Sequence, residues 1–110
     1  MPLTVNIYYT GSGDNARRFA QEMLSTGVVA EIRAKAGNLR YEYFLPMDDP
    51  GTVLLIDSWA SQESLDAHHH SPVMEKIIAL REKYDLHMTV ERYVADQAGM
   101  PEGDKAFVRE

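Results

Sequence analysis

Residues 52–59 read Thr-Val-Leu-Leu-Ile-Asp-Ser-Trp, and this stretch carries the most information about the fold. It follows a loop-type segment, residues 46–51, that contains two prolines and a glycine, and its length and composition predict a β-strand. The central residues 53–56 are apolar on both faces of that strand. Because a strand of this kind is usually buried from both sides, we expect both faces of its sheet to be covered.

The residues on either side of this strand predict three more strands and two helical regions. Residues 3–10 alternate between apolar and polar side chains, residues 39–45 are rich in aromatics, and residues 85–94 form the last candidate strand. A first helical region begins at Asn15 and continues, after a break at residues 26–27, over residues 28–34. The second helical region contains a helix capped by Ser61 and another that begins at Ser71-Pro72, whose buried stripe is Val73, Ile77, Leu80 and Tyr84.

The order β-α-β-β-α-β predicts an α+β fold with a ferredoxin-like antiparallel sheet. We expect residues 1–96 to form this single domain and residues 97–110 to form a tail that is loose or packed on a partner subunit. The helices cover one face of the sheet, and no remaining segment is large enough to cover the other. A second copy of the chain is the simplest cover, so we expect a homodimer.

Composition and charge exclude several classes of function. The net charge is −6 and no basic stripe is present, so we expect no nucleic-acid partner. The chain has no cysteine, which excludes disulfides, thiolate chemistry and cysteine-ligated metals. It contains neither a signal peptide nor an apolar run of membrane-spanning length, which favours a cytoplasmic protein without a membrane partner. The glycine-containing segment 11–13 is too weak to indicate a dinucleotide cofactor.

Several short motifs resemble those of the antibiotic biosynthesis monooxygenase family. Residues 33–41 resemble its R-x-E-x-G-x-x-x-Y segment. Residues 57–59, 65–68 and 71–72 are similar to its E-x-W … L-x-x-H-x-x-S run, without gaps. The resemblance extends over residues 2–94. Two positions differ from the family pattern, because Lys35 and Asp57 stand where the family has glutamate.

This resemblance implies a dimeric α/β barrel, in which the sheets of two ferredoxin-like protomers pack together and a pocket lies between sheet and helices. Some family members oxidise quinols or polycyclic phenols with molecular oxygen and without a metal or flavin. We therefore expect a cofactor-independent monooxygenase that acts on a small aromatic or quinol-type compound. Two alternatives stay open: an isomerase of a phosphorylated sugar that works through an enediolate, and a non-catalytic ligand-binding dimer. A related branch degrades heme, but Ile78 stands where its iron-ligating histidine is expected.

Among three consecutive histidines, the family match selects His68 as the candidate catalytic base. An imidazole titrates near neutral pH and can take a proton from a phenol or an acidic C–H group. Side chains of consecutive helical residues point about 100° apart, so His69 and His70 are expected to lie on the surface. The same geometry prevents the three imidazoles from converging on a metal ion.

The other candidate site residues come from the strands. Trp59 can form one wall of a pocket for a planar substrate. Asp57 can either orient His68 or form an ion pair with Arg33 or Arg40, and we favour the ion pair. Asn6 is out of phase with the apolar residues of its strand, so it projects from the sheet face away from the helices. In a dimeric barrel that face is the interior, where the amide must form a hydrogen bond, either with a substrate as a catalytic group or with a neighbouring side chain. The candidate substrate contacts are Trp59, Asp57, Tyr8 and Tyr41.

Overall fold

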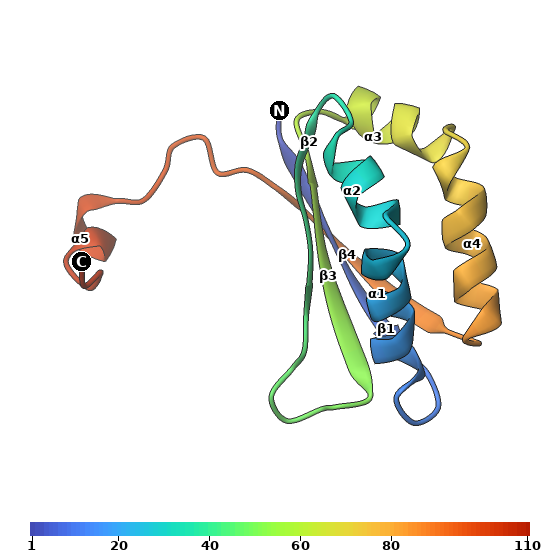
Figure 1. Cartoon of the computed structure of the whole chain (residues 1–110). Helices are drawn as coiled ribbons and strands as arrows, with labels where there is room; N and C mark the ends of the chain where they lie inside the picture. Colours follow the sequence, from blue (N-terminus) through green and yellow to red (C-terminus); the bar gives the residue numbers. More distant parts are fainter.

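The computed structural model describes residues 1–110 and contains one four-stranded sheet, with all helices except the short one in the C-terminal tail on one side (Figure 1). The predicted α+β, ferredoxin-like order of strands and helices is confirmed, and each predicted helical region is split into two helices. The boundaries of β1 and β3 match the predictions, β2 begins and ends one residue earlier than predicted, and β4 begins two residues later and ends where predicted. The elements are β1 Leu3–Thr10, α1 Asn15–Ser25, α2 Val28–Arg33, β2 Asn38–Phe44, β3 Thr52–Trp59, α3 Gln62–His69, α4 Val73–Lys83, β4 His87–Val94 and α5 Glu102–Lys105.

The sheet has the strand order β2-β3-β1-β4, and all neighbouring strands are antiparallel. Leu3 lies opposite Trp59 on one side and Val94 on the other, and this register continues without a slip to the other end of β1. Residues that lie opposite each other in an antiparallel pair project to the same face. The alternating pattern of β1 therefore fixes which residues of β3 and β4 face the helices.

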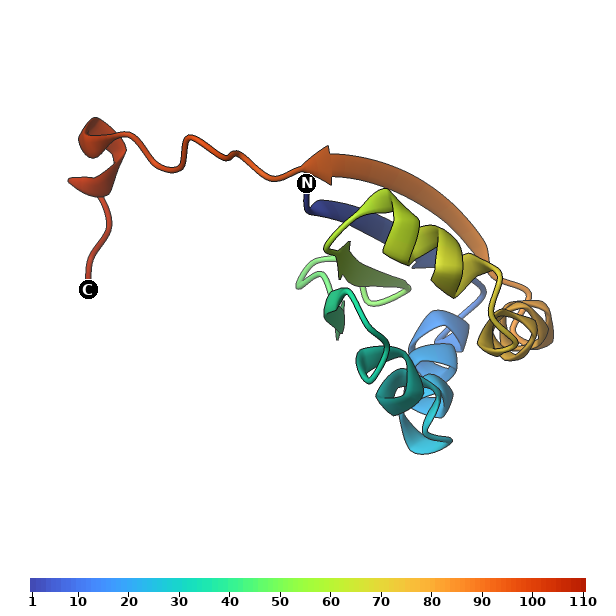
Figure 2. The same ribbon diagram turned by 90° about the horizontal axis from the view of Figure 1, so that it is seen from above.

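The hydrophobic core lies between the sheet and helices α1–α4 (Figure 2). Odd-numbered residues of β1 and β3, among them Val53, Leu55 and Trp59, are buried against the helices. The opposite face carries Leu54 and Ile56, which are only half-buried within one chain. The two-sided apolar pattern of β3 is thus covered by this chain on one side only.

Residues 95–110 leave the sheet after β4 and extend away from the helices (Figures 1 and 2). All of them are exposed, including Phe107 in the turn after α5, whose side chain is 89% exposed. The two longest helices, α1 and α4, have 11 residues each, and no helix has the length and apolar character needed to cross a membrane.

Candidate active site

A cavity of about 240 Å³ lies between the sheet and helices α3 and α4. For comparison, an aliphatic cavity of about 150 Å³ admits benzene, so this cavity has room for a compound with a second ring. Its β4 side is formed by half-exposed or exposed residues, so the cavity opens toward that edge of the sheet. Most of its lining is apolar, and the polar or charged side chains that border it are Tyr41, Asp57, His68, His69, Arg81 and Arg92.

Asp57 reaches the cavity from the centre of the core. Its side chain is only 5% exposed, because the alternation of β3 turns residue 57 toward the helices together with Leu55 and Trp59. One carboxylate oxygen, Oδ1, accepts a hydrogen bond of 2.6 Å from the indole Nε1 of Trp59. The other oxygen accepts no hydrogen bond from the chain, and it is not among the fully enclosed polar atoms. Asp57 therefore presents a free carboxylate oxygen to the cavity.

His68 lies beside this pair, near the end of α3. Its ring stacks on the ring of Trp59, with a centroid distance of 4.9 Å and an interplanar angle of 23°. The side chain is 4% exposed, and its Nδ1 is enclosed without a hydrogen-bond partner. The other ring nitrogen, Nε2, also has no hydrogen-bond partner in the chain but is not among the fully enclosed atoms, so it is the nitrogen that a ligand can reach.

The beginning of α3 is held in a way that fixes the position of His68. Ser61 and Ser64 form a reciprocal capping box. Gly37 packs directly on Ser64, where a Cβ atom at residue 37 would lie 2.5 Å from the Ser64 Cβ, and Gly37 has a positive φ of 85°. Only glycine satisfies both conditions. At the other end of the helix, the Ser71 hydroxyl donates to the carbonyl of His68, and Lys35 Nζ donates to that hydroxyl.

Burial displaces the pKa values of the two central groups in opposite directions. It raises the pKa of Asp57 from 3.8 to about 7, although the hydrogen bond from Trp59 and the charge of Arg81 act against the increase. It lowers the pKa of His68 from 6.5 to about 4, and the charges of Lys35, His69 and Arg81 act in the same direction. At neutral pH the imidazole is uncharged, and the carboxyl group is close to the midpoint of its titration.

Arg81 supplies a fixed positive charge at the cavity. Its Nε and Nη2 donate to the hydroxyl oxygen of Tyr9 at 3.2 and 2.9 Å, and its guanidinium lies 5.5 Å from the centre of the Tyr9 ring. No carboxylate pairs with it within 4.0 Å. Tyr41 also borders the cavity, and burial keeps the pKa of its phenol well above the usual 10.0, so it remains a neutral hydroxyl.

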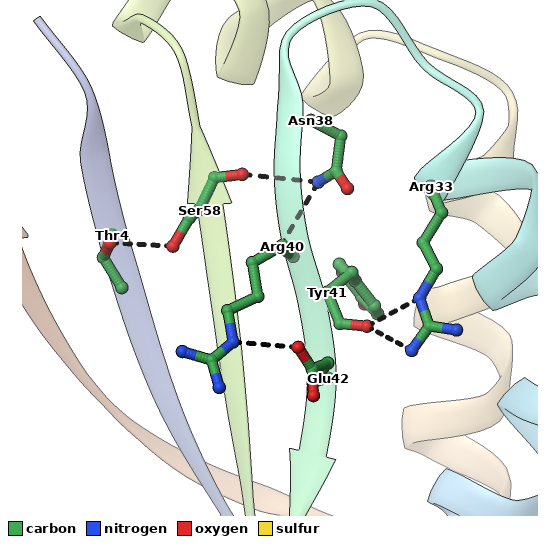
Figure 3. Close-up of polar contacts among 7 residues, drawn as sticks. All are labelled: Thr4, Arg33, Asn38, Arg40, Tyr41, Glu42 and Ser58. Atoms are coloured by element: carbon green, nitrogen blue, oxygen red, sulfur yellow. Dashed lines mark hydrogen bonds and ion pairs between the residues drawn. The ribbon is translucent and has the colours of Figure 1, made fainter. Parts of the chain in front are cut away.

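The favoured ion pair of Asp57 with Arg33 or Arg40 is wrong. Arg33 donates through Nε and Nη2 to the backbone carbonyl of Tyr41, at 2.9 and 2.7 Å, and Arg40 pairs with Glu42 at 3.0 Å (Figure 3). Arg33, at the end of α2, is held by the Tyr41 carbonyl. For Arg40 the physical reason is strand alternation. Residues 40 and 42 of β2 project to the open face of the sheet, whereas Asp57 projects to the helix face.

The structure brings together only some of the predicted site residues. Asp57, Tyr41 and His68 border the main cavity. Trp59 is fully buried behind His68 and does not border that cavity, so the predicted substrate contact of its ring is replaced by contacts with Asp57 and His68. Asn6 and Tyr8 project to the open face and are not brought together with His68 within one chain.

The open face nevertheless contains one unusual polar atom. The side-chain oxygen Oδ1 of Asn6 is enclosed and has no hydrogen-bond partner, as sequence phase alone could not show. The predicted surface positions of His69 and His70 agree with the structure, where both are exposed and His69 borders the cavity mouth. No group of three histidine, aspartate or glutamate side chains converges on a metal-sized site.

Arg81 was not predicted as a site residue, although its position in the sequence contains a signal for it. Arg81 lies four residues after Ile77, which belongs to the predicted buried stripe of α4, so both project from the same side of the helix. Met88, Val90 and Arg92 of β4 were missed as well. Their place in the cavity depends on the register between β1 and β4, which one strand alone does not reveal.

Comparisons with known proteins agree with this architecture. The profile of the family described as "Antibiotic biosynthesis monooxygenase" matches residues 2–80. A search of curated proteins found no match.

Three solved structures are similar in fold. A candidate antibiotic biosynthesis monooxygenase from Deinococcus radiodurans has a TM-score of 0.76 and 18% identity, covering 92% of this chain and 99% of its own. SnoaB, a cofactor-independent oxygenase from Streptomyces nogalater, has a TM-score of 0.72 and 15% identity, covering 92% and 98%. A candidate monooxygenase from Nitrosomonas europaea has a TM-score of 0.71 and 15% identity, covering 86% and 98%. At these identities the likeness shows the fold alone.

Proposed function

Because the chain belongs to the antibiotic biosynthesis monooxygenase family, we propose that it is a cofactor-independent monooxygenase that oxidises a small aromatic or quinol-type compound with molecular oxygen. The observation that carries this proposal is the mainly apolar cavity in which Asp57, His68 and Arg81 meet. An apolar lining suits an aromatic ring and dioxygen better than it suits a phosphorylated sugar. The cofactor-independent oxygenase SnoaB has the same fold.

In the proposed reaction the substrate supplies all the electrons. A substrate hydroxyl loses its proton, the resulting anion passes one electron to dioxygen, and the two radicals combine to form a C–O bond. Loss of water from this peroxide leaves a product that has gained one oxygen atom and lost two hydrogen atoms. The other atom of dioxygen leaves as water, so the reaction balances without an external reductant.

The residues around the cavity have distinct proposed roles. His68 hydrogen-bonds the substrate hydroxyl through its accessible ring nitrogen, Nε2, and assists its deprotonation. Tyr41 and Asp57 contact the substrate, and Trp59 positions both His68 and Asp57. Arg81 stabilises the negative charge that forms on the substrate, because a fixed cation is most effective in a site that contains little water.

We further propose that the protein is a cytoplasmic homodimer whose subunits meet through the open face of the sheet. Leu54 and Ile56 on this face are half-buried in one chain, and Phe44 and Tyr93 add exposed aromatic surface. A partner on this face would also enclose Asn6 and Tyr8.

Oxygen consumption tests the proposed activity. The purified protein is incubated with a panel of quinols, polycyclic phenols and phosphorylated sugars in an oxygen electrode, and metal and flavin content are measured on the same sample. We expect uptake with an aromatic compound and no stoichiometric metal or flavin. Turnover of a sugar without oxygen uptake would establish an isomerase instead, and saturable binding without turnover would establish a binding protein.

A further inference from the structure

We infer that Asp57 is a second catalytic group, whose free carboxylate oxygen takes the proton from the hydroxyl of the bound substrate. The substrate is accordingly an ionisable phenol or enol that reacts as its anion, not a neutral arene. This inference rests on the proposed function of the cavity. It is tested below by proton binding, which does not depend on oxygen chemistry.

The geometry around Asp57 leaves one carboxylate oxygen free for this role. Trp59 holds Oδ1 at 2.6 Å and thereby fixes the plane of the carboxylate, while the second oxygen has no partner in the chain. The group lies inside the core, yet it forms no ion pair. A buried carboxylate without a paired cation is costly for stability, so its presence at the cavity wall calls for an explanation other than stability.

The proton balance of the step favours Asp57 over His68 as the final acceptor. The O–H bond of the substrate breaks, its electron pair stays on the substrate oxygen, and a new O–H bond forms on the carboxylate. With a pKa of about 7, Asp57 holds a proton about a thousandfold more tightly than His68, whose pKa is about 4. His68 then donates or accepts a hydrogen bond at the same substrate oxygen without keeping the proton.

The distribution of charge in the cavity after the proton transfer also favours Asp57 as the acceptor. Protonation of Asp57 removes its negative charge, so the new substrate anion is next to a neutral carboxyl group and within the field of Arg81. The titratable and charged groups around the carboxyl, from each element packed against it, are Tyr9 of β1, Tyr41 and Tyr43 of β2, His68 of α3, Arg81 of α4 and Arg92 of β4. Burial keeps the pKa values of the three tyrosines above 10.0, so these phenols already hold their protons, and it lowers the pKa of His68. Asp57 is therefore the group that can take and keep the proton near neutral pH.

The test uses 4-nitrophenolate as a probe and measures proton uptake on binding. At about pH 8, titration calorimetry in buffers of different ionisation enthalpy should show the wild-type protein taking up about one proton for each anion bound, because the bound anion raises the pKa of Asp57 further. Asp57→Asn should take up none. It should also bind the anion about tenfold more tightly at this pH, since no carboxylate with a pKa of about 7 has to be protonated first.

Two further variants separate a catalytic role from a structural one. Asp57→Glu keeps a carboxyl and should retain proton uptake, and Asp48→Asn, an exposed carboxyl in the β2–β3 loop, should behave as wild type. Asparagine can still accept the hydrogen bond of Trp59, so the fluorescence of this single tryptophan reports whether the site has kept its structure. The inference is overturned if the wild type binds the probe without proton uptake, if Asp57→Asn takes up the same proton, or if the probe does not bind. Proton uptake without oxygen consumption by any phenol would uphold the role of Asp57 and refute only the oxygenase.

Discussion

Replacing Asp57 with asparagine should stabilise the protein, and increasingly so as the pH rises. The pKa of this carboxyl is raised in the folded protein to about 7 from its ordinary 3.8. The folded state therefore holds the proton more tightly than the unfolded state, and stability is lost as the pH increases from the lower value to the higher one. The difference corresponds to about 4 kcal/mol in total, of which about 3 kcal/mol falls between about pH 5 and about pH 8.

Urea unfolding of wild type and Asp57→Asn at these two pH values, at one fixed protein concentration, measures the effect. His68 also affects the pH dependence, because its pKa is lowered on folding, but it does so equally in both proteins. The gain in unfolding free energy of the variant over wild type should therefore grow by about 3 kcal/mol from the lower pH to the higher. Asp48→Asn serves as the exposed control and should show no such growth. A variant whose advantage stays constant with pH would show that the carboxyl titrates normally and that our account of its burial is mistaken.

Three further predictions concern neighbouring groups. His68→Ala should lower the rate of oxygen uptake by at least about 10²-fold, whereas His70→Ala, at an exposed position that does not border the cavity, should remain near wild type in the same oxygen-electrode assay. Arg81→Gln removes the positive charge that lowers the pKa of Asp57, so carboxyl NMR should find this aspartate titrating at higher pH than in wild type; an unchanged or lower midpoint would contradict the assignment. Ile56→Asp places a charge on the open face of the sheet and should convert a dimer to a monomer in light scattering, and a wild type that is already monomeric at micromolar concentration would refute the proposed interface.

The fold could be predicted because the local sequence patterns identify the strands and helices, and the order of these elements along the chain matches one known arrangement. The alternation in β1 and the uninterrupted apolar centre of β3 each indicate a strand, and Ser61 indicates the start of α3 through its capping role. Strand order then follows from the ferredoxin-like sequence of elements. The small errors lie at the ends of β2 and β4, where polar or exposed residues provide no burial signal.

The site was predictable only where one element contains the information. The family motif and helix geometry together select His68 among three neighbours, and the structure shows it buried while the other two are exposed. The partner of Asp57 could not be predicted, because strand phase alone does not say that Arg40 projects to the other face. For the same reason, Asn6 and Tyr8 could be placed on a face but not in a pocket.

The opposite pKa changes of Asp57 and His68 have a single cause, and this cause bears on how the site works. Burial disfavours whichever form is charged, so it raises the pKa of the Asp57 carboxyl and lowers the pKa of the His68 imidazole. Near pH 7 the cavity then contains at most one negative charge, Arg81 and Arg92 supply positive charge at its border, and most of the remaining lining is apolar. Such an environment admits dioxygen and an uncharged phenol. In the proposed mechanism, the substrate anion is the only negative charge beside Arg81 once Asp57 has taken the proton, and this anion is the species that donates an electron to dioxygen.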